Sequence, residues 1–201
     1  MLYHTYEAFM KLIKIGMIWF VIFLILATLF PPEGYNSFVY TMSELAHQGY
    51  VRAFILLIGF YGNGVFFIAS GMNAYKHKSL SPVLYKSLIL SGLCIMGLGL
   101  FQTNYDYYGI RATDSLILMY LHIVCAVLNH ITGYVMVWFH IKHSEKDIKK
   151  IHTRYLILNM ILVVIFVFTP VYRGLFQRIL FIVGGIWFWF YFNVFESKKR
   201  T

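Results

Sequence analysis

Long apolar stretches alternate with short polar ones along the whole chain. A membrane-spanning helix needs about 20 consecutive, mostly apolar residues. Stretches of about this length lie near residues 11–30, 51–71, 84–102, 115–139, 155–171 and 177–195. The pattern predicts an all-α polytopic membrane protein, in which residues 1–201 form a single domain of six transmembrane helices.

The composition supports a membrane environment. The chain of 201 residues is 60% hydrophobic and only 12% charged, whereas an average protein has roughly 25% charged residues. A water-soluble domain of this length could not keep so much apolar surface away from water. The two cysteines, Cys94 and Cys125, lie inside apolar stretches and give no disulfide framework.

The basic residues predict the orientation in the membrane. The chain has 17 Lys and Arg residues. If the N-terminus lies inside the cell, only four of them lie in outer segments: Arg52, Arg111, Arg173 and Arg178. This positive-inside bias predicts a multi-pass protein of the cell membrane with both termini in the cytoplasm. It also accounts for the net charge of +9, so we expect membrane lipids as partners and no nucleic acid. A homo-oligomer stays open.

Polar residues near the outer side are candidates for a site, because polar groups at membrane depth cost free energy. Ser43 and His47 are four residues apart and would share a face if their segment were α-helical. His122 lies about 12 Å below the outer end of the fourth predicted helix. The complete outer group is Ser43, Glu44, His47, Asp106, Arg111 and His122.

Deeper in the membrane, the sequence places Asn63, Asn129 and His130. They could contribute to ligand binding. The alternative is structural: the two asparagines form hydrogen bonds between helices, and Gly62 and Gly64 allow the helices to approach closely. For His130, the structural alternative is a neutral imidazole bonded to a helix carbonyl or to an asparagine.

Four other histidines lie among lysines on the predicted inner side: His77, His140, His143 and His152. The His-x-x-His spacing at 140–143 lacks the acidic residue or cysteine that would complete a metal site. We interpret the basic stretch around it as a solvated loop near anionic lipid headgroups.

Several short motifs are similar to those of a known family. They are "SELA" (43–46), "FQTNYD" (101–106), Leu121-His122 and "GLFQRI" (174–179). With them the chain resembles the bacterial and archaeal six-helix membrane proteins of domain-of-unknown-function family 998. The resemblance implies a six-helix membrane fold and no assigned activity, and it adds weight to Ser43, Asp106 and His122.

A second resemblance is to the membrane hydrolase superfamily of alkaline ceramidases and progestin-and-adipoQ-type receptors. Those proteins hold zinc with three histidines beside a serine and an aspartate. Ser43-x-x-x-His47 fits that spacing, whereas the closing His-x-x-x-His of the last helix is absent. The resemblance implies zinc only in this alternative, with His47, His122 and Asp106 as ligands.

Two functions follow from these residues. The first is a small membrane protein with an outward-facing polar pocket, in which Glu44, Asp106 and His122 bind a lipid headgroup or a small polar ligand. The alternative is an intramembrane hydrolase or transferase acting on lipids. In its metal-free form, His122 activates Ser43 and Asp106 orients the imidazole ring. Whether the protein is an enzyme stays open, and no inverted repeat points to a transporter.

Overall fold

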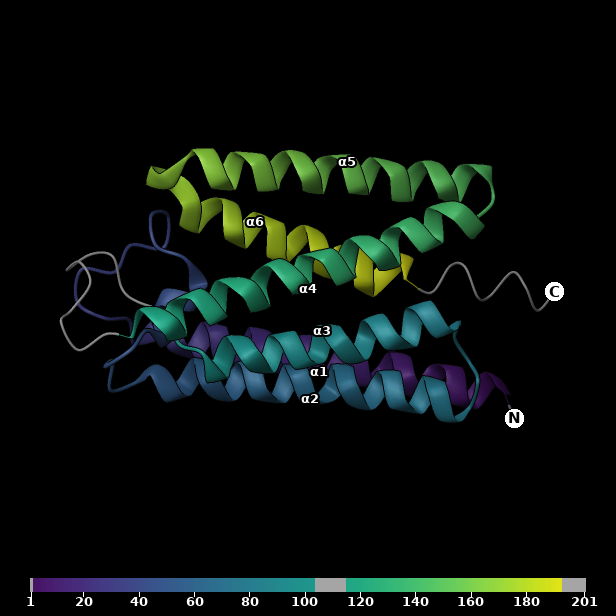
Figure 1. Cartoon of the computed structure of the whole chain (residues 1–201), viewed down its shortest axis with the longest axis horizontal. Coiled ribbons are helices and arrows are strands. Elements are labelled where there is room, and N and C mark those ends of the chain that lie inside the picture. Colours follow the sequence, from purple (N-terminus) through teal and green to yellow (C-terminus); the bar gives the residue numbers. More distant parts are fainter. Residues whose placement is uncertain (1, 104–114, 193–201) are drawn as a thin grey trace. The chain divides into compact units, whose positions relative to one another are not determined.

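The computed structural model describes residues 2–103 and 115–192, and the regular structure in these ranges is helical (Figure 1). Six helices are long and apolar enough to cross a membrane. They are α1 (Leu2–Leu29), α2 (Ala53–Lys76), α3 (Pro82–Leu100), α4 (Leu116–His143), α5 (Lys146–Phe168) and α6 (Arg173–Ile186), the last span including the short helical turns on either side of α6. The prediction of an all-α chain with six such helices is confirmed, and the architecture indicates a multi-pass membrane protein.

The fourth and fifth helices extend further than predicted. Helix α4 continues to His143 and α5 begins at Lys146, so only Ser144 and Glu145 separate them. The prediction that residues 140–154 form a loop between the fourth and fifth helices is therefore wrong. Hydropathy marks the part of a helix that fits the hydrocarbon core, and it does not mark polar turns that continue the same helix beyond that core.

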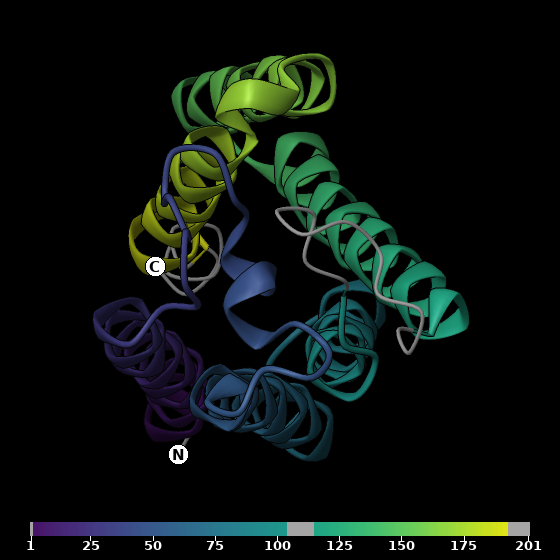
Figure 2. The same ribbon diagram turned by 90° about the vertical axis from the view of Figure 1, so that its left-hand side faces the viewer.

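The chain divides into two compact units. The first comprises Met1–Tyr35 and Met42–Gly133, and the second comprises Asn36–Thr41 and Tyr134–Thr201. Helix α4 contributes its first part to one unit and its last part to the other. Figure 2 views the same ribbon along the helices.

Glycines bring the helices of the first unit close together. A Cβ atom at Gly64 of α2 would lie 2.6 Å from the carbonyl oxygen of Gly92 in α3, and a Cβ at Gly92 would lie 2.6 Å from that of Gly64. A Cβ at Gly62 would overlap the ring of Trp19 in α1, whose Nε1–H donates to the carbonyl of Ile58 at 3.0 Å. The predicted role of Gly62 and Gly64 in close helix approach is confirmed.

Local sequence signals set several helix ends. Phe30, the first residue after α1, precedes Pro31 and Pro32, and proline disfavours helical backbone in the residue before it. Ser81 caps α3 by accepting a hydrogen bond from the Leu84 N–H at 3.4 Å, with a proline at the first helical position. Ser115 caps α4 in the same way, since its hydroxyl accepts from the Leu118 N–H at 3.4 Å.

In the second unit, the segment Asn36–Thr41 is bound to the start of α6. The Gly174 N–H donates to the carbonyl of Val39 at 3.1 Å, and Arg178 Nη1 lies within hydrogen-bond reach of the carbonyl oxygens of Ser37 (2.6 Å) and Tyr40 (3.0 Å). A Cβ at Gly174 would overlap the Tyr40 carbonyl oxygen. The motif "GLFQRI" therefore anchors this segment through Gly174 and Arg178.

Candidate functional site

The polar segment after α1 is buried in the first unit. Residues 42–48 are all buried, with Glu44 and His47 each only 3% exposed. Met42–Ala46 form a 3₁₀-helix, η1. Because 3₁₀ geometry aligns residues three apart rather than four, the α-helical face expected to join Ser43 and His47 is not formed. Both side chains are nevertheless buried in the same short segment.

The turn from η1 into α2 is fixed by several contacts. His47 Nδ1 lies 2.7 Å from the carbonyl oxygen of Gln48, and since a carbonyl only accepts, Nδ1 carries the donated proton. Gly49 has a φ of 74°, a conformation that favours glycine. The Tyr50 hydroxyl donates to the Phe30 carbonyl at 2.5 Å, which holds the turn against the end of α1.

Gln48 links this segment to the ends of two helices. Its main-chain N–H donates to the Thr103 carbonyl at 3.0 Å, and its side-chain Nε2 donates to the carbonyls of Gln102 and Ser115, both at 3.1 Å. The Ser115 N–H donates in return to Gln48 Oε1 at 2.8 Å. Sequence reasoning missed this residue, because no motif marks it and a glutamine in an outer segment is ordinary.

His122 of α4 caps the end of α3. Its side chain is buried, and Nδ1 lies 2.7 Å from the Phe101 carbonyl oxygen and 3.1 Å from that of Leu98. The Nδ1 proton is therefore donated to main-chain acceptors, and Nε2 is the nitrogen that carries the lone pair when the ring is neutral. Within the described ranges, no hydrogen bond to Nε2 is found.

The other predicted members of the site are placed only in part. Asp106 and Arg111 lie outside the described residues. Among residues 2–103 and 115–192, no hydrogen bond joins Ser43 to His122. The two α3 carbonyls orient the His122 ring, and the orienting role of Asp106 stays a prediction.

A zinc site receives no support from the part of the chain that the structure describes. There, no group of three or more His, Cys, Asp and Glu side chains could hold a metal ion. His47 and His122 each place Nδ1 against a carbonyl oxygen, which leaves at most Nε2 for a metal. The predicted third ligand, Asp106, lies outside the described ranges.

The polar residues predicted deeper in the membrane lie in three different surroundings. The Ser91 hydroxyl of α3 donates to Asn129 Oδ1 of α4 at 2.5 Å, which confirms the predicted hydrogen bond between helices. Asn63 Oδ1 is buried beside Gly16 of α1 and finds no hydrogen-bond partner among the described residues, so the bond expected there is not formed by this atom. His130 has an exposed side chain on α4.

A second buried cluster was not predicted. His140 of α4 and His152 of α5 are both 0% exposed, and their ring centroids are 5.2 Å apart. The interpretation of these two residues as part of a solvated loop is wrong, because they lie on polar helical turns that pack inside the second unit. The signal that could have found them is their position on inward faces of helices continued past the hydrophobic stretches.

A π-helical turn, η4 (Trp187–Tyr191), completes this cluster. It places Trp187 Nε1 3.0 Å from His152 Nδ1, to which it donates. His152 Nε2 is buried and has no hydrogen-bond partner within the described ranges. His140 lies between two carbonyl oxygens, with Nδ1 2.7 Å from that of Met136 and Nε2 3.2 Å from that of Phe192.

These features indicate a multi-pass membrane protein whose regular structure in the described ranges is helical, with a buried polar segment at one end of its first unit. The family described as "Protein of unknown function (DUF998)" matches residues 14–192. The match covers most of the chain, and the protein belongs to this family, which confirms the resemblance drawn from its motifs. No curated protein and no solved structure gives a significant match.

Proposed function

We propose that this protein spans the cell membrane with both termini in the cytoplasm, and that its outer end binds a lipid headgroup or another small polar ligand. The observation that supports a site most directly is the burial of Ser43, Glu44 and His47 in one short segment. Ionisable side chains buried in a membrane protein cost free energy and commonly mark functional sites, also where they form hydrogen bonds within the chain as His47 does with Gln48. A binding role explains why a membrane protein keeps them there.

The side chains suit a hydroxylated or cationic headgroup. The Glu44 carboxylate attracts an ammonium group and accepts hydrogen bonds, while the Ser43 hydroxyl both donates and accepts. The Nε2 lone pair of His122 accepts a hydrogen bond from a ligand hydroxyl or ammonium, since its Nδ1–H is held by the end of α3. Asp106 and Arg111 remain predicted members of the same site.

Gln48 supports the same proposal by fixing the surroundings. It bonds to Gln102, Thr103 and Ser115, the residues on either side of 104–114. These flanking residues therefore lie against Gln48, next to the segment that contains Ser43, Glu44 and His47. This connection is independent of the sequence motifs.

The alternative is an intramembrane hydrolase or transferase acting on lipids. One observation favours it: carbonyl oxygens hold the His122 ring through Nδ1, so Nε2, which forms no hydrogen bond among the described residues, is the nitrogen that would act as the general base. In this alternative, Nε2 takes the proton of the Ser43 hydroxyl. The absence of a hydrogen bond between these two residues in the described structure makes binding the better-supported function.

Ligand-dependent thermal stability tests the proposal. The purified protein is heated with a panel of soluble headgroup compounds: phosphocholine, phosphoethanolamine, ethanolamine, glycerol 3-phosphate and inositol. A ligand at 100 times its Kd stabilises the folded state by about 2.7 kcal/mol. We expect at least one compound to raise the melting temperature of the unchanged protein.

The variant His122→Asn makes this test specific. The asparagine amide keeps a donor near the position of Nδ1 for the α3 carbonyls and removes Nε2, so the protein should fold and lose the ligand response. Ser87→Ala, in the same unit, is the control that should keep the response. If no compound stabilises the protein, or His122→Asn responds as strongly as the control, the binding proposal is wrong. Release of a lipid product that requires Ser43 would favour the enzyme.

A further inference from the structure

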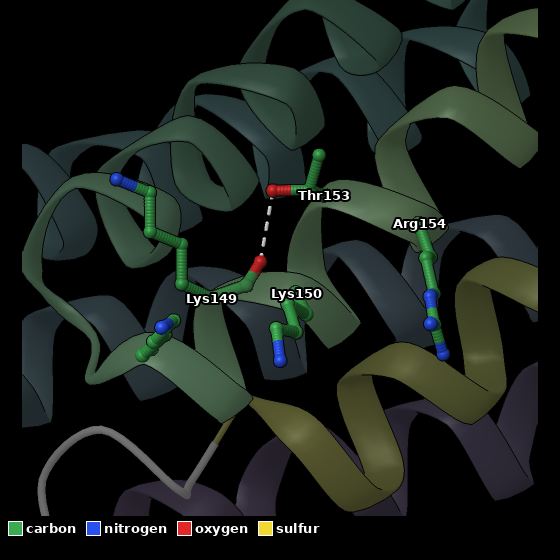
Figure 3. Close-up of a pocket in the computed structure, with 5 residues that line it drawn as sticks. Lys149, Lys150, Thr153 and Arg154 are labelled. Carbon is green, nitrogen blue, oxygen red and sulfur yellow. Dashed lines mark hydrogen bonds between the residues drawn. The ribbon is translucent and has the colours of Figure 1, made fainter.

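A shallow hollow lies on one face of α5 near its start. It is lined by Lys146, Lys149, Lys150, Thr153 and Arg154. Figure 3 labels the last four of these, with Lys149 and Lys150 one turn before Thr153 and Arg154. Spacings of three, four, seven and eight residues place them on a common face. The three lysines and Arg154 are exposed, so their charged groups are accessible.

The positive charge of this hollow is only partly compensated. Asp147 pairs with Lys150 at 3.3 Å, but the pair is exposed and therefore weak. Among the described residues, no acidic side chain forms an ion pair with Lys146, Lys149 or Arg154. The hollow thus gathers four cationic side chains, of which only Lys150 forms an ion pair with a described acidic residue.

The position of the hollow at the start of α5 adds to its positive electrostatic potential. It lies over the first turns of α5, where the free main-chain N–H groups give the helix its positive end. Cationic side chains at that end repel the helix dipole, and Glu145 makes no side-chain capping bond there. An anion in the hollow would reduce the repulsion among the cationic side chains and their repulsion of the positive end of the helix.

The apolar part of α5 follows directly. Ile157, Leu158 and Ile161 are exposed, at 53%, 46% and 51%. The hollow therefore lies where polar turns meet the stretch of the helix that would face acyl chains. An anionic ligand that fits this boundary has a charged head and an apolar tail.

We propose that this hollow binds the phosphate of an anionic phospholipid in the inner leaflet of the membrane. The donors are the ammonium groups of Lys146 and Lys149 and the guanidinium of Arg154. Thr153, whose hydroxyl donates to the Lys149 carbonyl at 2.8 Å, also lines the hollow. This site is separate from the outer site and does not depend on its ligand.

Lipid retention by the full chain tests the proposal. The protein is reconstituted in nanodiscs of phosphatidylcholine with increasing phosphatidylglycerol, and native mass spectrometry measures the anionic lipid that stays bound. The variant Lys149→Gln/Arg154→Gln removes two cations from the hollow. Lys76→Gln/Lys86→Gln, which changes two exposed lysines of the first unit, is the charge-matched control.

We expect the unchanged protein and the control to prefer phosphatidylglycerol. At about 1 kcal/mol per basic residue, the hollow variant should retain it roughly 30-fold less well. Its melting temperature in pure phosphatidylcholine should equal that of the control, which separates lost binding from lost folding. The preference should also fall as salt rises.

Two results would overturn the proposal. One is an equal loss of phosphatidylglycerol in the hollow variant and the control, or no preference at all. The other is displacement of the lipid by inorganic phosphate at the same total phosphate concentration, which would show that the hollow binds free phosphate and not a lipid headgroup.

Discussion

Gln48 and Ser115 exchange two hydrogen bonds across 67 positions of the sequence: the Ser115 N–H donates to Gln48 Oε1 at 2.8 Å, and Gln48 Nε2 donates to the Ser115 carbonyl at 3.1 Å. The side-chain amide of Gln48 thus pairs with both main-chain groups of Ser115, its N–H and its carbonyl. The pair ties the buried polar segment to the start of α4.

Gln48→Ala should lower the free energy of unfolding by about 1–3 kcal/mol, because it leaves main-chain groups of Ser115 and Gln102 without their partners. Denaturation in mixed micelles measures the change. Gln102→Ala is the control, because within the described ranges only the main chain of Gln102 forms hydrogen bonds. Equal stability of the two variants would show that the side-chain hydrogen bonds of Gln48 contribute nothing to stability.

Gly64→Ala should separate α2 from α3. The new Cβ would lie 2.6 Å from the Gly92 carbonyl oxygen, and overpacking of this kind costs about 1–3 kcal/mol. Gly133→Ala is the matched control, because a Cβ there meets nothing within 4 Å and alanine favours a helix over glycine by about 1 kcal/mol. The two variants should therefore shift the melting temperature in opposite directions. A neutral Gly64→Ala would contradict the close helix approach.

Ser91→Ala removes the hydroxyl that donates to Asn129 Oδ1 between α3 and α4. Hydrogen bonds between membrane helices contribute about 0.6 to 2 kcal/mol, and the variant should lose that amount of stability. Ser87→Ala, at a buried position on the same helix, controls for the loss of a small polar side chain. If both substitutions lower the free energy of unfolding equally, the hydrogen bond between Ser91 and Asn129 does not contribute to stability.

Trp187→Phe removes the N–H that His152 Nδ1 accepts and leaves both nitrogens of this buried ring without a partner among the described residues. The expected loss is about 1–3 kcal/mol. Trp138→Phe changes a tryptophan that is 55% exposed and should be nearly neutral. Loss of stability in Trp138→Phe alone would contradict the packing of the second unit.

The helices were predictable because their signal is the length of an apolar stretch, which the bilayer itself sets. The prolines after α1 and the serine before α3 also predict their helix ends. The start of α5 was not predictable from hydropathy, because its first turns are as polar as a loop. Only the packing of His152 and Trp187 shows that those turns are helical and partly buried.

The candidate site was predictable in its residue types and less so in its contacts. His122 stands out because it is an ionisable group in an apolar stretch, and Ser43 because it lies in a motif. Neither property predicts that carbonyls of α3 orient the His122 ring, because main-chain acceptors leave no mark in a sequence. Gln48 was missed for the same reason, since its side chain bonds to main-chain groups of Gln102 and Ser115.

We propose that the buried polar segment 42–48 lies at the outer side of the membrane, and the labelling of engineered cysteines tests this most directly. Val51, 88% exposed, precedes α2 and lies next to this segment, whereas Lys76 ends the same helix. Single variants Val51→Cys and Lys76→Cys are treated in intact cells with a membrane-impermeant maleimide, and the unchanged chain gives the background from Cys94 and Cys125. We expect Val51→Cys to be labelled in intact cells and Lys76→Cys only after permeabilisation. The reverse pattern would contradict it.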